Sequence, residues 1–398
     1  MQRSSVSAST RPFWLLVGIR VAFWLGTAFT LLWAPIPGDR VPPFSAYDSR
    51  TDLLFGTFAQ WDAQWFVRVA DDGYDALAAT VFFPLYPLVV HVLGFVFQST
   101  LVAGVLVSLV AAGLGAAAIA KLGTPLAGHR AAHDGVLLLA LFPTAFVFTA
   151  PQSDGLFLAL SAWALLAAHH KHGWLAGLLA ALSVATRLLG LALVPALIVA
   201  FWPRPFTPRG LLRLAPLLLV PLALAAYALF LQNRFGDAFA FVHAQQTYWV
   251  RDVPTLGPLG GLWDSLAAGW HGAAELGLHL PPARRETEFA QRDQVAAWNA
   301  LHALLLVIAC VLTVVAWRRL GAWLGVYSAA MITLILIAPP PYFPLASFPR
   351  YLLGDFPLFL ALAALLETRP RARTCVLFGF SAVGAVAAVA YSRKIWIG

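Results

Sequence analysis

Cysteine and charge are both scarce in this 398-residue chain. It has two cysteines, Cys310 and Cys375, and only 11% of its residues are charged. Both cysteines lie inside apolar runs, so we treat them as small apolar residues that imply no disulfide framework. The chain also lacks a glycine-rich nucleotide loop, a Walker motif and zinc-ligand spacing. These absences argue against a nucleotide-dependent enzyme and leave the redox compartment open.

Apolar residues dominate instead. Hydrophobic residues make up 60% of the chain, and its mean hydropathy is +0.77. A soluble core cannot use so many apolar residues, which predicts an all-α, polytopic integral membrane protein whose spanning helices need about 20 residues each. We expect about eleven spans, because loops rich in proline, glycine and charge separate the apolar stretches. These are Phe13–Ala34, Thr100–Leu122, Gly135–Ala150, Asp154–Ala168, Trp174–Thr186, Leu188–Trp202, Leu211–Leu231, Val295–Trp317, Ala322–Ala338, Tyr351–Leu366 and Cys375–Tyr391.

Basic residues indicate how the chain crosses the membrane. The first apolar run predicts an uncleaved anchor, and most Lys and Arg residues then fall on one side, which the positive-inside rule makes the cytoplasm. The other side receives two long loops, 35–81 and 232–294, and nearly every carboxylate except Asp134 and Glu367. The net charge of +8 is therefore a topology signal, and we expect no nucleic-acid partner. We treat residues 1–398 as one multi-pass domain of the cell membrane, with its chemistry on the extracytoplasmic face.

Residues 82–97 do not fit this alternation. The segment begins Phe-Phe-Pro-Leu-Tyr-Pro and is apolar enough to enter the bilayer, but counting it as a span would place Lys121 and Arg130 outside. Pro84 and Pro87 interrupt helical hydrogen bonding, which at membrane depth is tolerated only beside protein or a water-filled cavity. We expect a re-entrant or interfacial helix on the outer side. A proline-kinked span with a different topology is the alternative.

Asp62 is the most unusual carboxylate of the first outer loop. At helical spacing Phe58, Trp65 and Phe66 share one face, and Asp62 falls within that apolar stripe. Desolvation disfavours the charged form of a carboxylate, and a group tuned in this way suits a general base near neutral pH. The alternative is a helix cap before Ala63, although no Glu or Gln follows three residues later to complete a capping box. We favour the base.

A second carboxylate and two arginines are expected on the same side. Ser153 and Asp154 stand at the start of an apolar helix, where both are good N-caps, but a helix N-terminus also favours a bound anion. Arg187 interrupts a long apolar run, and Arg350 opens a later span. An arginine near membrane depth is unfavourable without a partner, and its fork suits a phosphate or a carboxylate. Snorkelling to the interface is the alternative.

Short blocks of sequence point to a family when they are taken together. The first contains Trp61-Asp62, Phe66 and Gly73-Tyr74, and the second is Phe82-Phe83-Pro84-Leu85-Tyr86-Pro87-Leu88. Further blocks follow in order at 141–157, 185–190, 236–245 and 349–359. Over most of its length the chain therefore resembles the GPI mannosyltransferase II (PIG-V-like) family.

The resemblance implies a GT-C glycosyltransferase of class EC 2.4.1.-, which takes a sugar, usually mannose, from a polyprenyl phosphate donor on the non-cytoplasmic face. Asp62 then matches the family's first-loop acidic residue, the base that deprotonates the acceptor hydroxyl in an inverting displacement. Arg187 and Arg350 match basic positions that we assign to the donor phosphate. The chain departs from the family at Asp154, where Glu is more usual.

Other side chains are expected to bind substrate or to support the site. They are Trp61, Trp65, Tyr86, Ser153, Asp154, His243, Gln245 and Tyr351. We expect no required cofactor and no metal, because two arginines and a helix N-terminus can stabilise a leaving phosphate; a divalent ion held by Asp62 and Asp154 is the alternative. The alanine-rich composition with Arg favoured over Lys predicts a bacterium, so the acceptor is expected to be another glycolipid, a cell-wall glycan or a protein.

Two other classes of protein share this composition. A transporter or flippase of lipid-linked sugars also needs outward polar sites among its helices, but it predicts inverted repeats, and no internal repeat is visible in the chain. A non-catalytic membrane subunit predicts that Asp62 can be replaced without loss of function.

Overall fold

Helices form nearly all of the regular structure. The computed structural model describes residues 3–33, 50–203, 207–278, 292–395 and 397, and no strand occurs within these ranges. The α-helices are α1 (Arg3–Trp33), α2 (Arg50–Phe55), α3 (Asp62–Asp72), α4 (Leu85–Phe97), α5 (Thr100–Leu141), α6 (Asp154–His169), α7 (Gly173–Thr186), α8 (Leu193–Phe201), α9 (Leu219–Phe235), α10 (Ala240–Trp249), α11 (Pro258–Leu278), α12 (Arg292–Arg319), α13 (Ala322–Leu336), α14 (Phe348–Leu352), α15 (Phe356–Leu366) and α16 (Pro370–Ser392). The predicted all-α polytopic fold is confirmed.

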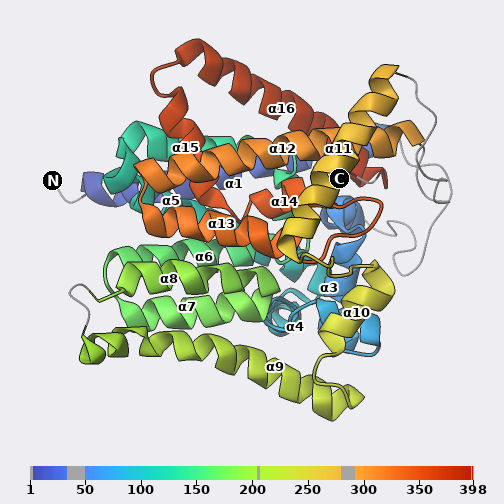
Figure 1. Ribbon diagram of the computed structural model, residues 1–398. Coiled ribbons are helices and arrows are strands. Elements are labelled where there is room, and N and C mark those ends of the chain that lie inside the picture. The colour runs from blue at the N-terminus through green and yellow to red at the C-terminus, as the bar shows by residue number, and fades with distance from the viewer. Residues whose placement is uncertain (1–2, 34–49, 204–206, 279–291, 396, 398) are drawn as a thin grey trace.

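The long helices run side by side in one bundle (Figure 1). Small residues let them approach closely, as membrane helices commonly do. A Cβ on Gly155 of α6 would lie 2.1 Å from the carbonyl oxygen of Ser108 on α5, and one on Gly177 of α7 would lie 2.4 Å from the carbonyl oxygen of Pro216. Close packing around α5, α6 and α7 therefore forms the centre of the bundle.

Helix lengths separate the predicted spans into two groups. Five helical segments are long and apolar enough to cross a membrane by length and composition: Thr10–Trp33, Thr100–Leu141, Pro208–Phe235, Val295–Arg319 and Pro370–Ser392. Apart from Gly135–Ala150, whose first residues lie in α5, the remaining predicted spans coincide with apolar helices of 10–17 residues, so length alone does not support about eleven crossings. The span predicted to continue to Ala150 ends at Leu141, and a 3-10 turn, η3 (Ala145–Thr149), follows it.

Gly128 divides α5 into two antiparallel halves. Its φ of 88° lies in the left-handed region, where glycine has no Cβ to clash. A Cβ on Gly123 would lie 3.1 Å from the Cβ of Ala132, whereas nine residues of straight helix would separate the two by about 13 Å. The chain therefore turns back at Gly128, between the two spans predicted there.

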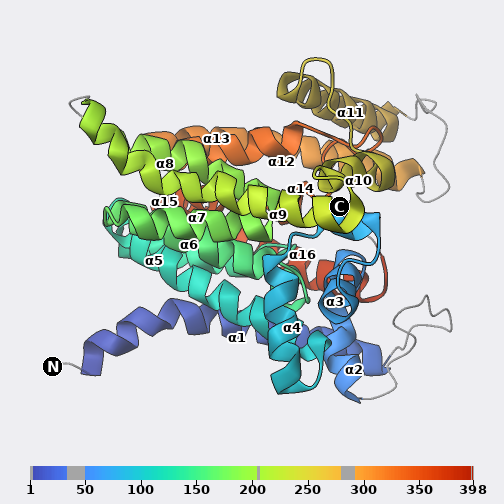
Figure 2. The ribbon, with the colours of Figure 1, turned by 90° about the horizontal axis from the view of Figure 1, so that it is seen from below.

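Helix α4, within the predicted re-entrant segment, lies across the bundle. It is seen end-on in Figure 1 and upright in Figure 2, whereas the bundle helices run horizontally in both views. Its 13 residues cover about 20 Å, too little for a hydrocarbon core of about 30 Å. Tyr86 and Val90 are buried, and Leu88, Val92 and Phe95 are exposed. An interfacial position for α4 stays a prediction that this orientation favours.

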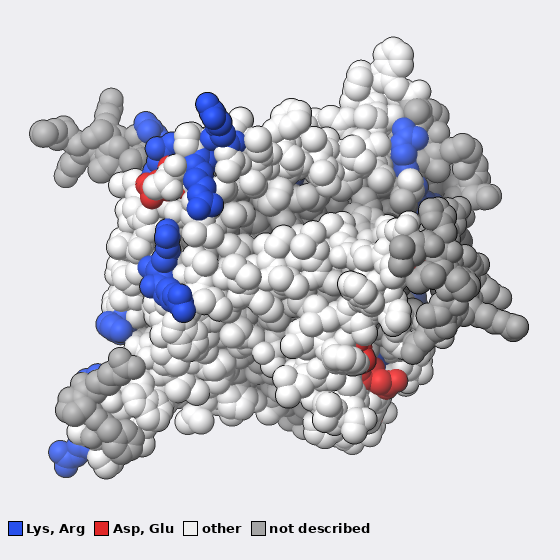
Figure 3. Space-filling model, turned by 45° about the horizontal axis from the view of Figure 1, so that its top comes forward, with Lys and Arg blue, Asp and Glu red and all other residues white. Residues whose placement is uncertain are grey.

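Most of the basic side chains visible in Figure 3 gather at one end of the bundle. At this end Lys171 lies between α6 and α7, and Arg319 is the last residue of α12. Arg373 of α16 donates hydrogen bonds of 2.6 and 2.7 Å to the two carboxylate oxygens of Asp134 on α5. Helices α3, α4 and α10 lie at the opposite end (Figure 1). Parts of both predicted outer loops, 34–49 and 279–291, lie outside the described residues.

Candidate active site

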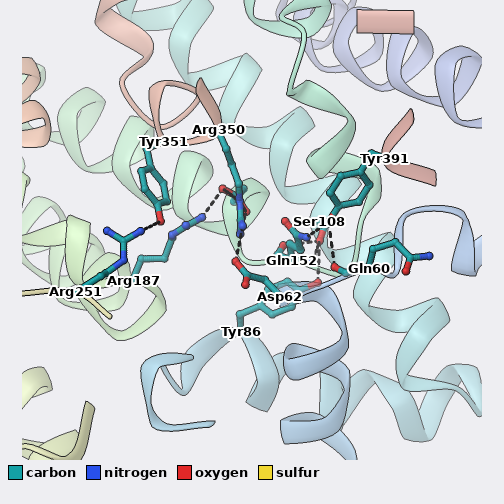
Figure 4. A network of polar contacts seen from close by, with 11 residues as sticks. Gln60, Asp62, Tyr86, Ser108, Gln152, Arg187, Arg251, Arg350, Tyr351 and Tyr391 are labelled. Atoms are coloured by element: carbon teal, nitrogen blue, oxygen red, sulfur yellow. Dashed lines mark hydrogen bonds and ion pairs between the residues drawn. The ribbon is translucent and has the colours of Figure 1, made fainter. Parts of the chain in front are cut away.

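Four charged side chains meet at the end of the bundle opposite the basic one. Arg350 donates a hydrogen bond of 2.5 Å from Nη1 to Oδ2 of Asp62, 288 residues away in the sequence. Its Nη2 donates to Oδ2 of Asp154 at 2.8 Å, and its Nε is 3.1 Å from both oxygens of that carboxylate. Arg187 donates to Oδ1 of Asp154 as well. Figure 4 shows this arginine–carboxylate cluster, which joins the predicted base to both predicted arginines.

Asp154 is the buried hub of the cluster. Its side chain is only 5% exposed, and it accepts hydrogen bonds from both arginines. Asp154 begins α6, and Ser153 occupies the N-cap position, but the Ser153 side chain makes no cap hydrogen bond. The capping alternative is therefore wrong for both side chains. The snorkelling alternative is wrong for Arg187 and Arg350, whose side chains are mostly buried and are paired with a carboxylate.

Asp62 is the accessible carboxylate of the cluster. Its side chain is 34% exposed, and only Oδ2 is engaged by Arg350 among the described residues, so Oδ1 can accept a proton from a ligand. Asp62 begins α3 after Trp61, with no side-chain cap, so the capping alternative is wrong here too. The expectation that the Asp62 carboxylate has purely apolar surroundings is also wrong, because the guanidinium of Arg350 lies against it.

The unusual backbone conformation of Trp61 orients the Asp62 side chain. Its φ of 48° is rare for a residue with a large side chain and costs of order 1–3 kcal/mol. The Trp61 ring packs on Tyr391 of α16 with centroids 4.9 Å apart. The Tyr391 hydroxyl donates to the carbonyl oxygen of Gln60 at 3.0 Å. Contacts with α16 thus hold the chain in the conformation that directs Asp62 toward Arg350.

A buried chain of hydrogen bonds supports the same region. The Tyr86 hydroxyl donates to the Gly104 carbonyl at 2.9 Å and lies 2.8 Å from the hydroxyl of Ser108. Ser108 donates to the carbonyl of Gln152 at 2.8 Å, and the Gln152 amide donates to the Tyr391 hydroxyl at 2.9 Å. Tyr86 is therefore a structural support that links α4, α5 and the start of α6.

The other predicted residues divide into near and distant groups. Tyr351 lies at the cluster, with its ring centroid 5.4 Å from the Arg187 guanidinium carbon. Trp65 follows Asp62 by one helical turn and packs on Trp249 of α10, with centroids 6.2 Å apart. His243 is exposed and bonds Asp237 at 2.7 Å, which lowers the pKa of that carboxyl. The structure therefore does not bring His243 into contact with the cluster.

Three buried side-chain oxygens near this region have no hydrogen-bond partner among the described residues. They belong to Gln152, Ser153 and Gln245. Buried polar groups are normally paired, so unpaired ones mark positions where a ligand or water completes the bonding. Ser153 and Gln245 were expected from sequence to be near the substrate, and Gln152 was not.

Sequence reasoning missed three contributors besides Gln152. Tyr391 and Ser108 are uncharged and lie inside apolar helices, so no pattern distinguishes them from packing residues. Arg251 follows α10 and donates to the Tyr351 hydroxyl at 3.5 Å. The sequence feature that could have indicated Arg251 is the charged pair Arg251-Asp252, which follows the apolar end of α10.

Arg350 also decides whether a metal fits between the two carboxylates. The alternative of a divalent ion held by Asp62 and Asp154 needs oxygens of both residues to be free, but the Arg350 guanidinium bridges them. Within the described part of the chain, no group of three or more His, Cys, Asp or Glu side chains is placed to hold a metal ion. This arrangement does not fit a shared ion at that position, and metal independence stays a prediction.

The fold and the cluster define a polytopic helical membrane protein with an arginine-bridged carboxylate pair at one end of its bundle. Comparison with known proteins identifies the family. The family model described as mannosyltransferase (PIG-V) matches residues 29–250, more than half of the chain, and the chain belongs to this family. Arg350 lies beyond the matched residues, and only the fold brings it to Asp62.

Curated relatives match a shorter part of the chain. GPI alpha-1,6-mannosyltransferase 2 of Rattus norvegicus is 30% identical over 167 residues, which are 39% of this chain and 34% of the relative. The protein of the same name from Mus musculus is 31% identical over 164 residues, 38% of this chain and 33% of the relative. The match thus spans about a third of the length of these curated relatives.

Proposed function

We propose that the protein is a GT-C type glycosyltransferase. It transfers mannose from a polyprenyl phosphate to an acceptor hydroxyl on the extracytoplasmic side of the cell membrane. The observation that carries this proposal is the partly exposed Asp62 carboxylate, which has one oxygen held by Arg350 and one oxygen open. Membership of the PIG-V mannosyltransferase family supports the sugar and the reaction class.

The proposed chemistry is a single inverting displacement. Oδ1 of Asp62 accepts the proton of the acceptor hydroxyl while the hydroxyl oxygen forms a bond to the anomeric carbon of the sugar. The bond from that carbon to the phosphate oxygen breaks, and its electron pair leaves with the polyprenyl phosphate. Arg350 fixes the direction of Asp62. Its Nε and Nη2 atoms donate to Asp154, and its Nη1 atom donates to Asp62.

The acceptor is proposed from chemistry and composition. The curated relatives are named as GPI mannosyltransferases. For a bacterial chain we propose a glycolipid, a cell-wall glycan or a protein as acceptor, together with the surrounding membrane lipids as partners. The basic end of the bundle (Figure 3) then faces the cytoplasm, and the arginine–carboxylate cluster at the other end faces outward.

Replacing Asp62 by Asn tests the proposed base. The variant keeps the shape of the side chain but loses the proton acceptor, so transfer of labelled mannose from a polyprenyl phosphate to membrane acceptors should fall at least about 100-fold. Asp72→Asn is the matched control, because Asp72 ends the same helix and is exposed. Transfer at the wild-type rate by Asp62→Asn, with Asp72→Asn unchanged, would refute the assignment of Asp62 as base.

The same assay separates the rival classes. A transporter or flippase would move the labelled lipid across vesicles without forming a new glycoside, and a non-catalytic subunit would show no transfer after purification. The proposal also predicts that a chelator leaves the rate unchanged, because an arginine side chain rather than a metal ion is proposed to stabilise the leaving phosphate. Loss of transfer on chelation, restored by a divalent ion, would contradict that part.

A further inference from the structure

The charges of the arginine–carboxylate cluster balance within the cluster. Asp62 and Asp154 contribute two negative charges, and Arg187 and Arg350 contribute two positive ones. Asp154 accepts hydrogen bonds from both arginines, and Nη1 of Arg350 is used on Asp62. The two arginines expected to bind the donor phosphate are therefore already neutralised by carboxylates. A phosphate that arrives with negative charge needs a further cation.

Arg251 lies beside this cluster and has no counter-ion among the described residues. It is half-buried, and its guanidinium makes two long hydrogen bonds, of 3.4 Å to the carbonyl oxygen of Ala338 and 3.5 Å to the hydroxyl of Tyr351. Both acceptors are neutral. No carboxylate in the described part of the chain lies within ion-pair distance of Arg251, in contrast to Arg187 and Arg350. A half-buried guanidinium held only by weak neutral contacts is free to turn toward an anion.

Tyr351 connects Arg251 to the cluster. The guanidinium carbon of Arg187 lies 5.4 Å from the centroid of the Tyr351 ring, and Arg251 donates to the hydroxyl of the same residue. Figure 4 shows Arg251, Tyr351 and Arg187 together to the left of Arg350, with Asp62 below the Arg350 guanidinium. An anion bound by Arg251 would therefore sit beside the arginines while the open oxygen of Asp62 remains available to an acceptor.

Exposed apolar side chains follow Arg251, with the exposed Asp252 and Thr255 among them. Val250 and Val253 flank it and are exposed by 52% and 62%. The next exposed apolar residues are Leu256 and, on α11, Leu259, Trp263, Leu266 and Trp270. The last four recur at helical spacing on one face of α11. A cation that has no counter-ion among the described residues, and that is followed by exposed apolar side chains, matches an amphiphile with an anionic head and a hydrocarbon chain.

We propose that Arg251 binds the phosphate of the lipid-linked sugar donor and of the lipid phosphate product, with the polyprenyl chain along Val250, Val253 and the apolar face of α11. This inference rests on the proposed function and deepens it. Arg187 and Arg350 then act as positioning residues that hold Asp154 and Asp62. The shared ligand chemistry is a phosphate monoester, and the apolar surface favours its lipid form over free phosphate.

Equilibrium binding tests Arg251 without relying on catalysis. The probe is a polyprenyl monophosphate added to the full chain in detergent micelles or nanodiscs, compared with the phosphate-free polyprenol and with inorganic phosphate. The variants are Arg251→Gln and the charge-preserving Arg251→Lys. Arg234→Gln is the matched control, because Arg234 is an exposed arginine that ends α9 and also makes a hydrogen bond to a neutral carbonyl oxygen.

The wild type should bind the polyprenyl monophosphate at least about tenfold more tightly than the polyprenol, as expected for a charged hydrogen-bond partner. Arg251→Gln should remove this difference, Arg251→Lys should keep part of it, and Arg234→Gln should leave it unchanged. With Asp62→Asn, binding should persist while transfer is lost. In steady-state transfer, Arg251→Lys should raise the donor KM more than it lowers kcat.

Three results would overturn the inference. One is an Arg251→Gln protein that melts at the wild-type temperature and still prefers the polyprenyl monophosphate over the polyprenol as strongly as the wild type does. Another is an equal loss of affinity for both lipids, which would indicate a structural role. The third is binding of inorganic phosphate as tight as binding of the lipid phosphate. Lipid phosphate binding that depends on Arg251, in a wild-type protein that transfers no sugar, would instead refute the proposed function and leave the inference standing.

Discussion

Asp154 pairs with two arginines at the end of the bundle, and its own side chain is only 5% exposed. Replacing Asp154 by Asn leaves Arg187 without a carboxylate and Arg350 with Asp62 alone. Breaking a buried ion pair from one side costs about 3–5 kcal/mol, because the remaining charge stays desolvated. We therefore expect Asp154→Asn to lower the midpoint of thermal unfolding by several degrees. Tryptophan fluorescence of the protein in detergent measures this midpoint.

Asp62→Asn provides the comparison for this change. Asp62 is 34% exposed and pairs with one arginine, so its replacement should shift the unfolding midpoint far less while abolishing transfer. If Asp154→Asn melted at the wild-type temperature, Asp154 would not be the structural hub that its contacts indicate.

The same contrast explains how far the sequence could predict the site. Asp62, Arg187 and Arg350 are charges in apolar surroundings, and such charges stand out in a sequence because they are unfavourable without a partner. Which charge pairs with which is set by contacts between residues up to 288 positions apart, and no local pattern contains that information. Asp154 was therefore expected as a cap or an accessory group, and Arg251 was missed.

Gly155 shows how the packing of α5 against α6 places Asp154. A Cβ on Gly155 would lie 2.1 Å from the backbone oxygen of Ser108, which cannot move aside as a side-chain tip could. Gly155→Ala should therefore push the start of α6 away from α5. Overpacking of this kind costs about 1–3 kcal/mol, and the displacement of Asp154 should also reduce transfer.

Gly379→Ala on α16 is the control for this prediction, since nothing lies within 4 Å of the added carbon. In a helix that change should be neutral or should stabilise by about 0.5–1 kcal/mol. Unfolding midpoints and transfer rates are measured for both variants. Equal behaviour of Gly155→Ala and Gly379→Ala would show that the close contact between α5 and α6 does not position the site.

Helix positions were the most predictable part of the fold, because apolar runs and their breakers are local signals. The break between Thr186 and Leu188 is at the predicted place, where α7 ends and Arg187 adopts an extended conformation. Helix ends set by tertiary packing were less predictable. The span expected to run from Gly135 to Ala150 ends at Leu141, because the chain then enters the 3-10 turn that leads to Asp154.

The whole molecule has its basic end and its arginine–carboxylate cluster at opposite ends of the bundle. Basic residues gather at one end (Figure 3), and the arginine–carboxylate cluster lies at the other with α3, α4 and α10 (Figure 1). The positive-inside rule places the basic end in the cytoplasm, which would give the cluster access to substrates on the outer side. The direction of the bundle in the membrane is therefore a testable consequence of the proposed function.

Labelling of single cysteines measures that direction. Cys310 and Cys375 are first replaced by Ser, and a cysteine is then introduced at Asp72 or at Lys171, which are both exposed and lie at opposite ends of the bundle. A membrane-impermeant maleimide should label position 72 in intact cells and position 171 only after permeabilisation. The Cys-free protein must retain transfer, so that the labelled molecules are folded. Labelling of both positions from the same side would contradict the separation of the two ends, and labelling of position 171 alone in intact cells would reverse the proposed orientation and place the cluster in the cytoplasm.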